Sequence, residues 1–300
     1  MAVAVKYRRN NLAETVKKLI AVDYCDADLK AAGQAWLDVM NDGEASKAAA
    51  AKLVEELNAS VMDGCTCEAC TLGRAVLADK DLLVKKSQWI FGGDGWAYDI
   101  GYGGLDHVLA SGEDVNVFVF DTEVYSNTGG QASKASNIGQ VAQFAASGKE
   151  MKKKSLSEIA MAYGYVYVAQ VAMGANPAQT IKAITEAEAY HGPSLIIGYA
   201  PCEMHSIKGG MTNCQAEMKK AVECGYWNLF RFNPAADKKF TLDSKAPAGG
   251  YQEFLMNEAR YSRLTREFPE RATVLFAKNE AAAKERYEHL LKLVDMYDKD

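Results

Sequence analysis

The sequence of 300 residues lacks a long hydrophobic run, a signal peptide and an excess of positive charge. No apolar stretch approaches the roughly 20 residues that cross a lipid bilayer, so we expect no membrane span. The formal net charge of −5 gives no sign of a nucleic-acid-binding surface. Residues 152–154 form the only run of three basic residues, and we interpret this run as the solvated start of a helix.

The N-terminus does not show charged, apolar and small residues in the order that a secretory signal peptide requires, so we expect a cytoplasmic protein. Seven cysteines are an odd number without any secreted context, which disfavours disulfides and leaves free thiols and metal ligation open. A hydrophobic fraction of 49% beside 24% charged residues is ordinary for a globular protein. The length suits one large α/β domain or two small ones.

The hydrophobic pattern divides the chain into three parts. Helical periodicity dominates residues 1–85, which we interpret as a helical lead-in to a sheet and not as a separate domain. Strands and helices then alternate over residues 86–235, which predicts an α/β domain with a mostly parallel sheet and helices on both faces. Residues 236–300 are expected to hold a linker, extending to residue 250, and helices that could clasp a neighbouring subunit or domain. The expected helices cover residues 11–22, 28–40, 46–57, 71–83, 99–110, 155–163, 176–190, 213–224, 251–267 and 280–298, and the expected strands cover residues 88–91, 115–120, 165–171, 194–199 and 227–232. Residues 128–148 are too long for a simple loop, which indicates a functional segment or a short helix.

Two polar stretches follow the first two strands of the α/β domain. Residues 92–99 read Gly-Gly-Asp-Gly-Trp-Ala-Tyr-Asp, and residues 121–130 read Asp-Thr-Glu-Val-Tyr-Ser-Asn-Thr-Gly-Gly. In parallel sheets, ligands bind beyond the carboxyl ends of the strands, where both stretches are expected to lie. Gly93 and Gly95 would let the backbone approach a phosphate closely and adopt positive φ, and the following helix N-terminus favours an anion.

Asp94 indicates a cation at this place, because a carboxylate alone would repel a phosphate. Mg²⁺ takes about six oxygen ligands, usually one or two from the protein and the others from phosphates and water. Thr122 could supply a second oxygen, and the carbonyl of Val124 a third. A lone Gly-Asp-Gly is a common turn, but paired stretches at strand ends favour a metal–diphosphate site. A dinucleotide site fits less well, because the next glycine after Gly95 is Gly101 and the G-x-G-x-x-G spacing is absent.

Read together, the two stretches resemble the thiamine diphosphate-binding part of the pyruvate:ferredoxin (flavodoxin) oxidoreductase family. The resemblance extends over about residues 1–235 and is strongest over residues 83–233. It implies thiamine diphosphate bound through Mg²⁺, with Thr122 at a ligand position that is often Asn in such motifs. The residues implied in binding the cofactor or the metal are Gly93, Asp94, Gly95, Thr122, Val124 and Asn127. The implied reaction is oxidative decarboxylation of pyruvate with coenzyme A to acetyl-CoA and CO₂, with electrons passed to ferredoxin or flavodoxin, in a homodimer.

Two further residues acquire roles through this resemblance. Asn127 matches a catalytic asparagine that faces the substrate over the thiazolium ring, whereas its place in the sequence alone favours a turn residue. Cys202 matches a ligand of the [4Fe–4S] cluster closest to thiamine, although a single cysteine is normally a buried apolar residue. A cubane cluster needs four thiolates, and the family's other three lie outside the matching segment. Either another polypeptide supplies them or the cluster is not built.

Cys65, Cys67 and Cys70 form a second group of candidate ligands. Their C-x-C-x-x-C spacing is not the usual zinc or iron–sulfur pattern, but together with Cys202 they would total four thiolates. Adventitious metal binding and free surface thiols are the alternatives that we favour from the sequence.

The sequence leaves the roles of four other polar residues open. His107 is expected to be a packing or surface residue. His205 and Lys208 could approach a cofactor phosphate or an acidic ferredoxin, or lie in a surface loop. Glu123 lies beside the metal site or is exposed.

We expect the chain to be incomplete as an enzyme. In the resembled family, a carboxylate from a different domain activates thiamine, and that domain is not represented in this sequence. The expectation is that the chain alone does not turn over pyruvate, and that Met1 is a true start or an internal methionine of a longer reading frame. The alternative is a non-catalytic cofactor-binding fragment, or one subunit of a split 2-oxoacid oxidoreductase that acts with partner chains.

Overall fold

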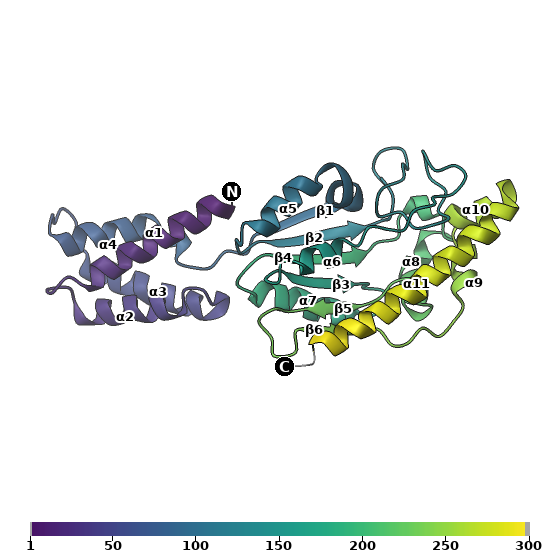
Figure 1. Ribbon diagram of the computed structural model, residues 1–300. Coiled ribbons are helices and arrows are strands. Elements are labelled where there is room, and N and C mark those ends of the chain that lie inside the picture. The colour runs from purple at the N-terminus through teal and green to yellow at the C-terminus, as the bar shows by residue number, and fades with distance from the viewer. Residues whose placement is uncertain (1, 298–300) are drawn as a thin grey trace. The chain divides into compact units, whose positions relative to one another are not determined.

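The computed structural model describes residues 2–297, and the side chains of residues 8–297. The chain divides into two compact units, Met1–Gln88 and Trp89–Asp300 (Figure 1). The boundary therefore falls three residues later than the expected end of the helical segment at residue 85. We describe each unit by itself.

The first unit consists of helices that bury a core of their own. Trp36, Leu53 and Leu57 are fully buried in it, together with Val16 and Val76. The side chains of Asp26 and Asp42 cap two of its helices by accepting backbone amides, as N-cap carboxylates do. The elements are α1 (Ala2–Ile20), α2 (Ala27–Val39), α3 (Gly43–Ser60), α4 (Glu68–Ala78) and the short 3₁₀ turn η1 (Lys80–Leu82). The interpretation of this segment as a lead-in without a domain of its own is wrong, because its apolar faces pack on one another.

The first helix also begins earlier than expected. The sequence placed its start at Asn10 or Asn11, but α1 runs from Ala2 and both asparagines lie inside it. Both are exposed, so their polar side chains reach water from the helix surface and need not cap anything.

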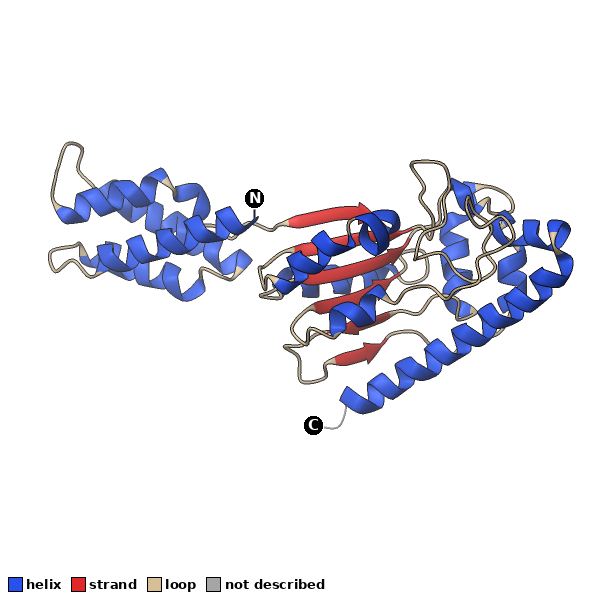
Figure 2. Cartoon of the chain, turned by 45° about the horizontal axis from the view of Figure 1, so that its top comes forward, coloured by secondary structure: helices blue, strands red, loops and turns tan. Residues whose placement is uncertain are grey.

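The second unit is built on a sheet whose order, among the described residues, is β1-β2-β4-β3-β5-β6 (Figures 1 and 2). The first four strands in this order are parallel, whereas β5 runs antiparallel to β3, and β6 antiparallel to β5. The strands are β1 (Trp89–Gly93), β2 (Asn116–Asp121), β3 (Tyr167–Val171), β4 (Ser194–Tyr199), β5 (Phe230–Phe232) and β6 (Phe240–Leu242). The predicted α/β class with a mostly parallel sheet is confirmed.

Helices cover both faces of this sheet, as the alternation of its side chains requires. Val117 and Leu195 belong to a core shared with α5 and α6, whereas Ala169 and Ile196 belong to a separate core shared with α7. The helical elements are η2 (Gly95–Ile100, a π-helical turn), α5 (Tyr102–Ala110), α6 (Leu156–Met161), α7 (Pro177–Ala189), η3 (Glu203–His205), η4 (Met211–Asn213), α8 (Cys214–Glu223), α9 (Tyr251–Met256), α10 (Ala259–Glu267) and α11 (Pro269–Tyr297).

The C-terminal part differs from its expected form. The expected linker contains β6, and the expected helix over residues 251–267 is two helices, α9 and α10, separated by Glu258 in an extended conformation. The last helix begins at Pro269, well before residue 280, with proline in the first turn where it is tolerated. Tyr261, Phe276 and Leu290 are buried in the same core as the sheet, so these helices complete this unit.

Two smaller expectations concern the segment over residues 128–148 and the membrane. The segment forms turns and isolated bridges, such as the pair Gln131 and Gln143, and holds no helix. Among the helices that the structure describes, none combines the length and the apolar character that a bilayer span requires.

Candidate functional site

The three predicted oxygen ligands lie together where β1 and β2 end. These strands are parallel neighbours, with Gly93 opposite Phe120, so their carboxyl ends meet at one edge of the sheet. The hydroxyl oxygen Oγ1 of Thr122 lies 2.7 Å from Oδ1 of Asp94 and 2.9 Å from the carbonyl oxygen of Val124. In octahedral Mg²⁺ coordination with bonds of 2.0–2.1 Å, adjacent oxygens are about 2.9 Å apart. The spacing of these oxygens therefore fits a small octahedral cation.

Asp94 is held in place by hydroxyl and amide donors. Its side chain is 1% exposed, and Oδ2 accepts a hydrogen bond of 2.6 Å from the hydroxyl of Ser133. The amide of Thr122 donates to Oδ1 at 3.2 Å. Burial raises the pKa of Asp94, while the bonds from Ser133 and Thr122 oppose that rise. A cation at this place would offset the burial and favour the carboxylate.

The two glycines beside Asp94 act differently from the expectation. Neither has a positive φ, so the expected left-handed backbone is absent at both positions. A Cβ atom at Gly95 would lie 2.4 Å from the ring of Tyr125, whereas one at Gly93 would meet nothing within 4 Å. Gly95 is therefore needed for close packing of Tyr125, and Gly93 leaves open space at the exposed end of β1.

This contrast gives a matched pair of variants. Gly95→Ala is expected to lower the free energy of unfolding by about 1–3 kcal/mol, because the new methyl group overpacks against Tyr125. Gly93→Ala is expected to leave stability nearly unchanged, because its methyl group enters open space. Urea unfolding of both variants beside the parent chain checks this. Equal losses in the two variants would contradict the role given to Tyr125.

Asn127 and Cys202 lie at the same edge of the sheet. Asn127 is exposed in the turn after Ser126, whose hydroxyl lies 2.6 Å from Oγ1 of Thr122. The same hydroxyl lies 3.5 Å from Sγ of Cys202, which follows β4, the other neighbour of β2. Ser126 therefore connects the loop of the oxygen ligands with the predicted cluster ligand. Among the described residues, no group of three or more metal-ligating side chains includes Cys202.

Glu123 is buried, which decides between the two alternatives that the sequence left open. Its side chain is 0% exposed and lies 3.0 Å from Nζ of Lys153 and 2.8 Å from Nη1 of Arg260. Lys153 also lies 2.8 Å from Oδ2 of Asp121. The interpretation of residues 152–154 as a solvated helix start is wrong for Lys153, because two buried strand-end carboxylates require a cation between them. The sequence signal that could have predicted a buried cation was the excess of acidic residues Asp94, Asp121 and Glu123 at the ends of β1 and β2.

The backbone of Glu123 is left-handed, with φ of 57°, which is uncommon for a residue with a side chain. Its carbonyl oxygen accepts hydrogen bonds from the hydroxyl of Ser136 at 2.6 Å and from the amide of Gln140 at 3.0 Å. These bonds and the buried ion pairs hold the turn in this conformation. This turn directs the Thr122 hydroxyl and the Val124 carbonyl toward each other.

The ion pairs decide which of these groups are charged. Burial alone would raise the pKa of Glu123, but Lys153 and Arg260 outweigh it and hold that pKa below its usual range. Burial would likewise lower the pKa of Lys153, yet Asp121 and Glu123 raise it above its usual value. The site loop therefore contains an ionised carboxylate paired with an ionised amine at neutral pH.

His205 is fully buried, so the surface-loop alternative is wrong for this residue, while Lys208 and His107 are exposed. Burial, reinforced by Arg260, holds the pKa of His205 well below its usual value, so the imidazole is neutral. Its Nδ1 accepts the amide of Cys202 at 3.0 Å. His205 thus fixes the backbone at Cys202 and does not present a charge to a phosphate.

Glu258 gives a pH-dependent prediction. Burial raises its pKa to about 7, although Arg260 opposes the rise, so the folded chain keeps this proton where the unfolded chain releases it near pH 4.5. As the pH rises from about 4.5 to about 7, this group is expected to remove up to about 3 kcal/mol of stability. Glu258→Gln removes that loss, so the variant should gain stability relative to the parent as pH rises. Urea unfolding at pH 5 and pH 7.5 checks this, and parallel pH profiles would contradict it.

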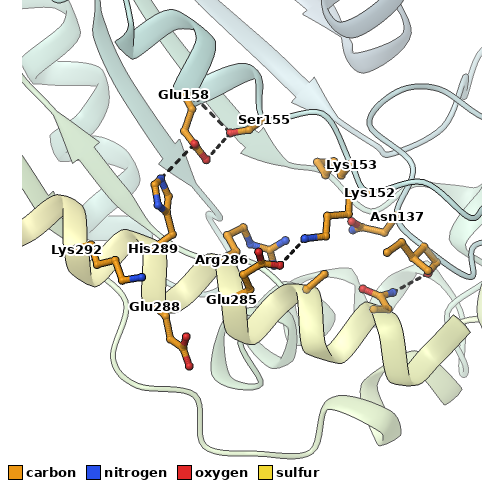
Figure 3. Close-up of a pocket in the computed structure, with 13 residues that line it drawn as sticks. Asn137, Lys152, Lys153, Ser155, Glu158, Glu285, Arg286, Glu288, His289 and Lys292 are labelled. Atoms are coloured by element: carbon orange, nitrogen blue, oxygen red, sulfur yellow. Dashed lines mark hydrogen bonds and ion pairs between the residues drawn. The ribbon is translucent and has the colours of Figure 1, made fainter. Parts of the chain in front are cut away.

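Two of the cavities that border this region bear on the site. One of about 410 Å³ opens beside α11, where Lys152 pairs with Glu285, and His289 Nε2 lies 3.3 Å from Glu158 (Figure 3). Two ion pairs lie in its lining, and none of the predicted metal or cofactor ligands lines it. A second cavity, of about 250 Å³, is bordered by Val124 and by Gly129, Gly130 and Arg260. This second cavity adjoins the loop of the oxygen ligands.

Residues 45–197 match the family described as "Thiamine pyrophosphate enzyme, C-terminal TPP binding domain". The chain is 52% identical over 299 residues to pyruvate:ferredoxin oxidoreductase of Moorella thermoacetica, covering 98% of this chain and 25% of that protein. It is 47% identical over 289 residues to pyruvate-flavodoxin oxidoreductase of Klebsiella pneumoniae, covering 95% of this chain and 24% of that protein. The chain thus spans about a quarter of the length of these curated relatives. A solved 2-oxoglutarate:ferredoxin oxidoreductase from Magnetococcus marinus overlaps 37% of this chain and 38% of its own, at 26% identity and a TM-score of 0.35, which is too loose to inform on the fold.

Proposed function

Since the chain belongs to the thiamine pyrophosphate enzymes, through their C-terminal cofactor-binding domain, we propose that Asp94, Thr122 and the Val124 carbonyl bind Mg²⁺ for the cofactor's diphosphate. The observation that carries this proposal is that the hydroxyl oxygen of Thr122 lies 2.7 Å from Oδ1 of Asp94 and 2.9 Å from the carbonyl oxygen of Val124. One carboxylate, one hydroxyl and one carbonyl leave room in an octahedral shell for diphosphate oxygens and water. The open space beyond Gly93 and the amides after Asp94 suit the approach of an anion.

The other residues of the edge then take supporting roles. When bound, thiamine diphosphate supplies a nucleophilic carbon and an electron sink for decarboxylation of a 2-oxo acid. Asn127, exposed in the turn that Ser126 fixes, donates its amide to an oxygen of the substrate where negative charge develops. Ser133 and Thr122 orient the Asp94 carboxylate, and Glu123 holds the turn that presents the carbonyl of Val124.

We further propose that the chain acts as part of a larger enzyme that oxidises pyruvate with coenzyme A to acetyl-CoA and CO₂ and reduces ferredoxin or flavodoxin. The printed names of the relatives support the substrate and the electron acceptors. A [4Fe–4S] cluster does not fit the residues around Cys202 alone, because it needs four thiolates. Cys202 would serve as one ligand only if other domains or partner subunits supply three more, and we derive no step through the cluster.

Calorimetric titration of the purified chain with thiamine diphosphate tests the binding site. We expect saturable binding with Mg²⁺ present and none after its removal by a chelator, because the phosphates then face the Asp94 carboxylate directly. Binding that is equally tight without any divalent cation would contradict the proposed ligands. In a second assay with pyruvate, coenzyme A and a redox dye, we expect no turnover by the chain alone. Turnover without any partner would show that the chain is a complete enzyme.

A further inference from the structure

Three thiols that the proposed cofactor site does not use come together in the helical unit. The Sγ atoms of Cys65, Cys67 and Cys70 all lie within 4.8 Å of one another. Cys67 is the N-cap residue of α4 and Cys70 is the third residue of that helix, so both point toward the start of its first turn. Cys65 arrives from the preceding turn, where its amide bonds the carbonyl of Met62 at 3.3 Å. A loop followed by a capped helix can thus bring together three cysteines with the unusual C-x-C-x-x-C spacing.

The surroundings hold these thiols in place and favour negative charge at Cys67. The amide of Cys70 donates to Sγ of Cys67 at 3.5 Å, at the positive end of an 11-residue helix. Arg74, on the next turn of α4, donates to the carbonyl oxygens of Met62 at 3.1 Å and of Cys65 at 2.5 Å. The guanidinium therefore fastens the cysteine-bearing loop to the helix. Cys70 is 4% exposed, while Cys65 and Cys67 are partly exposed, so the group is open to solvent on one side.

We propose that Cys65, Cys67 and Cys70 bind a thiophilic d¹⁰ cation, Zn²⁺, through three thiolates, with the fourth position open to water or another ligand. Zn–S bonds of about 2.3 Å place tetrahedral thiolates about 3.8 Å apart, so the thiols need to close by at most about 1 Å. Two of the three side chains are partly exposed and can rotate by that amount. Binding converts three S–H groups into three Zn–S bonds and releases three protons to the solvent. Soft thiolate ligands select Zn²⁺ over Mg²⁺, so this site does not compete for the metal proposed at Asp94.

The bound metal would link the loop before α4 to the helix itself. This inference is independent of the proposed cofactor site, because it uses no residue of the second unit. It predicts that Zn²⁺ raises the unfolding temperature of the chain in a concentration-dependent way, as any ligand specific for the folded state does.

The test is Zn²⁺ binding by the full chain, measured by competition with a chromophoric chelator after the chain has been freed of metal. We expect one Zn²⁺ per chain, with affinity reduced by more than about 100-fold in Cys65→Ser and in Cys67→Ser, since even outer-shell partners are worth about 10–100-fold. Serine is a favoured N-cap residue, so Cys67→Ser should keep α4 folded. Cys214→Ser, which removes a partly exposed thiol from α8 in the other unit, is the matched control and should bind as the parent does.

Two further measurements test whether all three thiols bind the metal. Cd²⁺ should give the ultraviolet absorption of three thiolate bonds, and bound Zn²⁺ should protect three thiols from alkylation. Unchanged affinity in the folded Cys67→Ser variant, or loss of binding in Cys214→Ser, would overturn the assignment. An iron–sulfur absorption that disappears in Cys67→Ser would overturn it as well, because it would show a cluster where we place Zn²⁺.

Discussion

Asp94→Asn is expected to abolish Mg²⁺-dependent binding of thiamine diphosphate, with an affinity loss of more than about 100-fold. The asparagine side chain keeps the shape and one oxygen, but it brings no charge to the metal. Its amide also replaces an oxygen that accepts a hydrogen bond from Thr122 or Ser133. The fold should survive, because burial already raises the pKa of Asp94 and a neutral group costs less to bury. Calorimetric titration, beside a thermal unfolding curve of each protein, separates the two effects.

Asp106→Asn is a suitable control for this experiment. Asp106 lies on α5 and accepts the hydroxyl of Tyr163 at 2.7 Å, outside the loops that hold the proposed metal ligands. We expect this variant to bind the cofactor as the parent does. If Asp94→Asn is folded and still binds with Mg²⁺-dependent affinity, the metal is held elsewhere and the proposed function loses its main support.

Glu123→Gln is expected to lower the free energy of unfolding by roughly 3–5 kcal/mol, a large part of the stability of a domain. The substitution removes one buried charge and leaves Lys153 and Arg260 without their shared partner. The new amide also faces Asn137 and Tyr226, which both donate to the carboxylate, so donors would meet donors. Urea unfolding with a common slope for parent and variant measures the loss.

Two companions of Glu123→Gln test the mechanism. Glu150→Gln removes an exposed ion pair with Arg271 and should change stability little, as surface pairs do. The double variant Glu123→Gln with Lys153→Met should lose less stability than the sum of the two single variants, because each single variant breaks the same ion pair between Glu123 and Lys153. If the double variant is as unstable as the sum of the single ones, the two residues are not coupled and the account of the network is wrong.

The sequence predicted the ligand edge of the site because short-range patterns determine it. Apolar β-branched runs marked β1, β2 and β4, and parallel strands place their following residues at one edge. Asp94, Thr122 and the Val124 carbonyl could therefore be brought together on paper, and the structure places them within hydrogen-bonding distance. Their role as metal ligands stays a prediction.

The buried ion pairs that hold the loop after β2 could not be predicted in the same way. Lys153 and Arg260 come from a loop and from α10, and a single buried cation in a run of lysines leaves no periodic signal. The left-handed backbone of Glu123 also depends on distant partners, because a glutamate does not favour it locally. The same limit applies to the helical unit. Its amphipathic helices indicate that each has a buried face, but the sequence does not show that these faces pack on one another.

The position of Arg260 sets the order in which the site can form during protein synthesis. Thr122, Glu123 and Val124 leave the ribosome long before α10 is made, so Glu123 at first lacks one of its two cations. At translation rates of about 5–20 residues per second, this interval is on the order of ten seconds. The helical unit has its own core and can fold within that time. A nascent chain stalled before α10 should therefore contain a folded helical unit and a turn over residues 122–124 that has not yet taken its final shape.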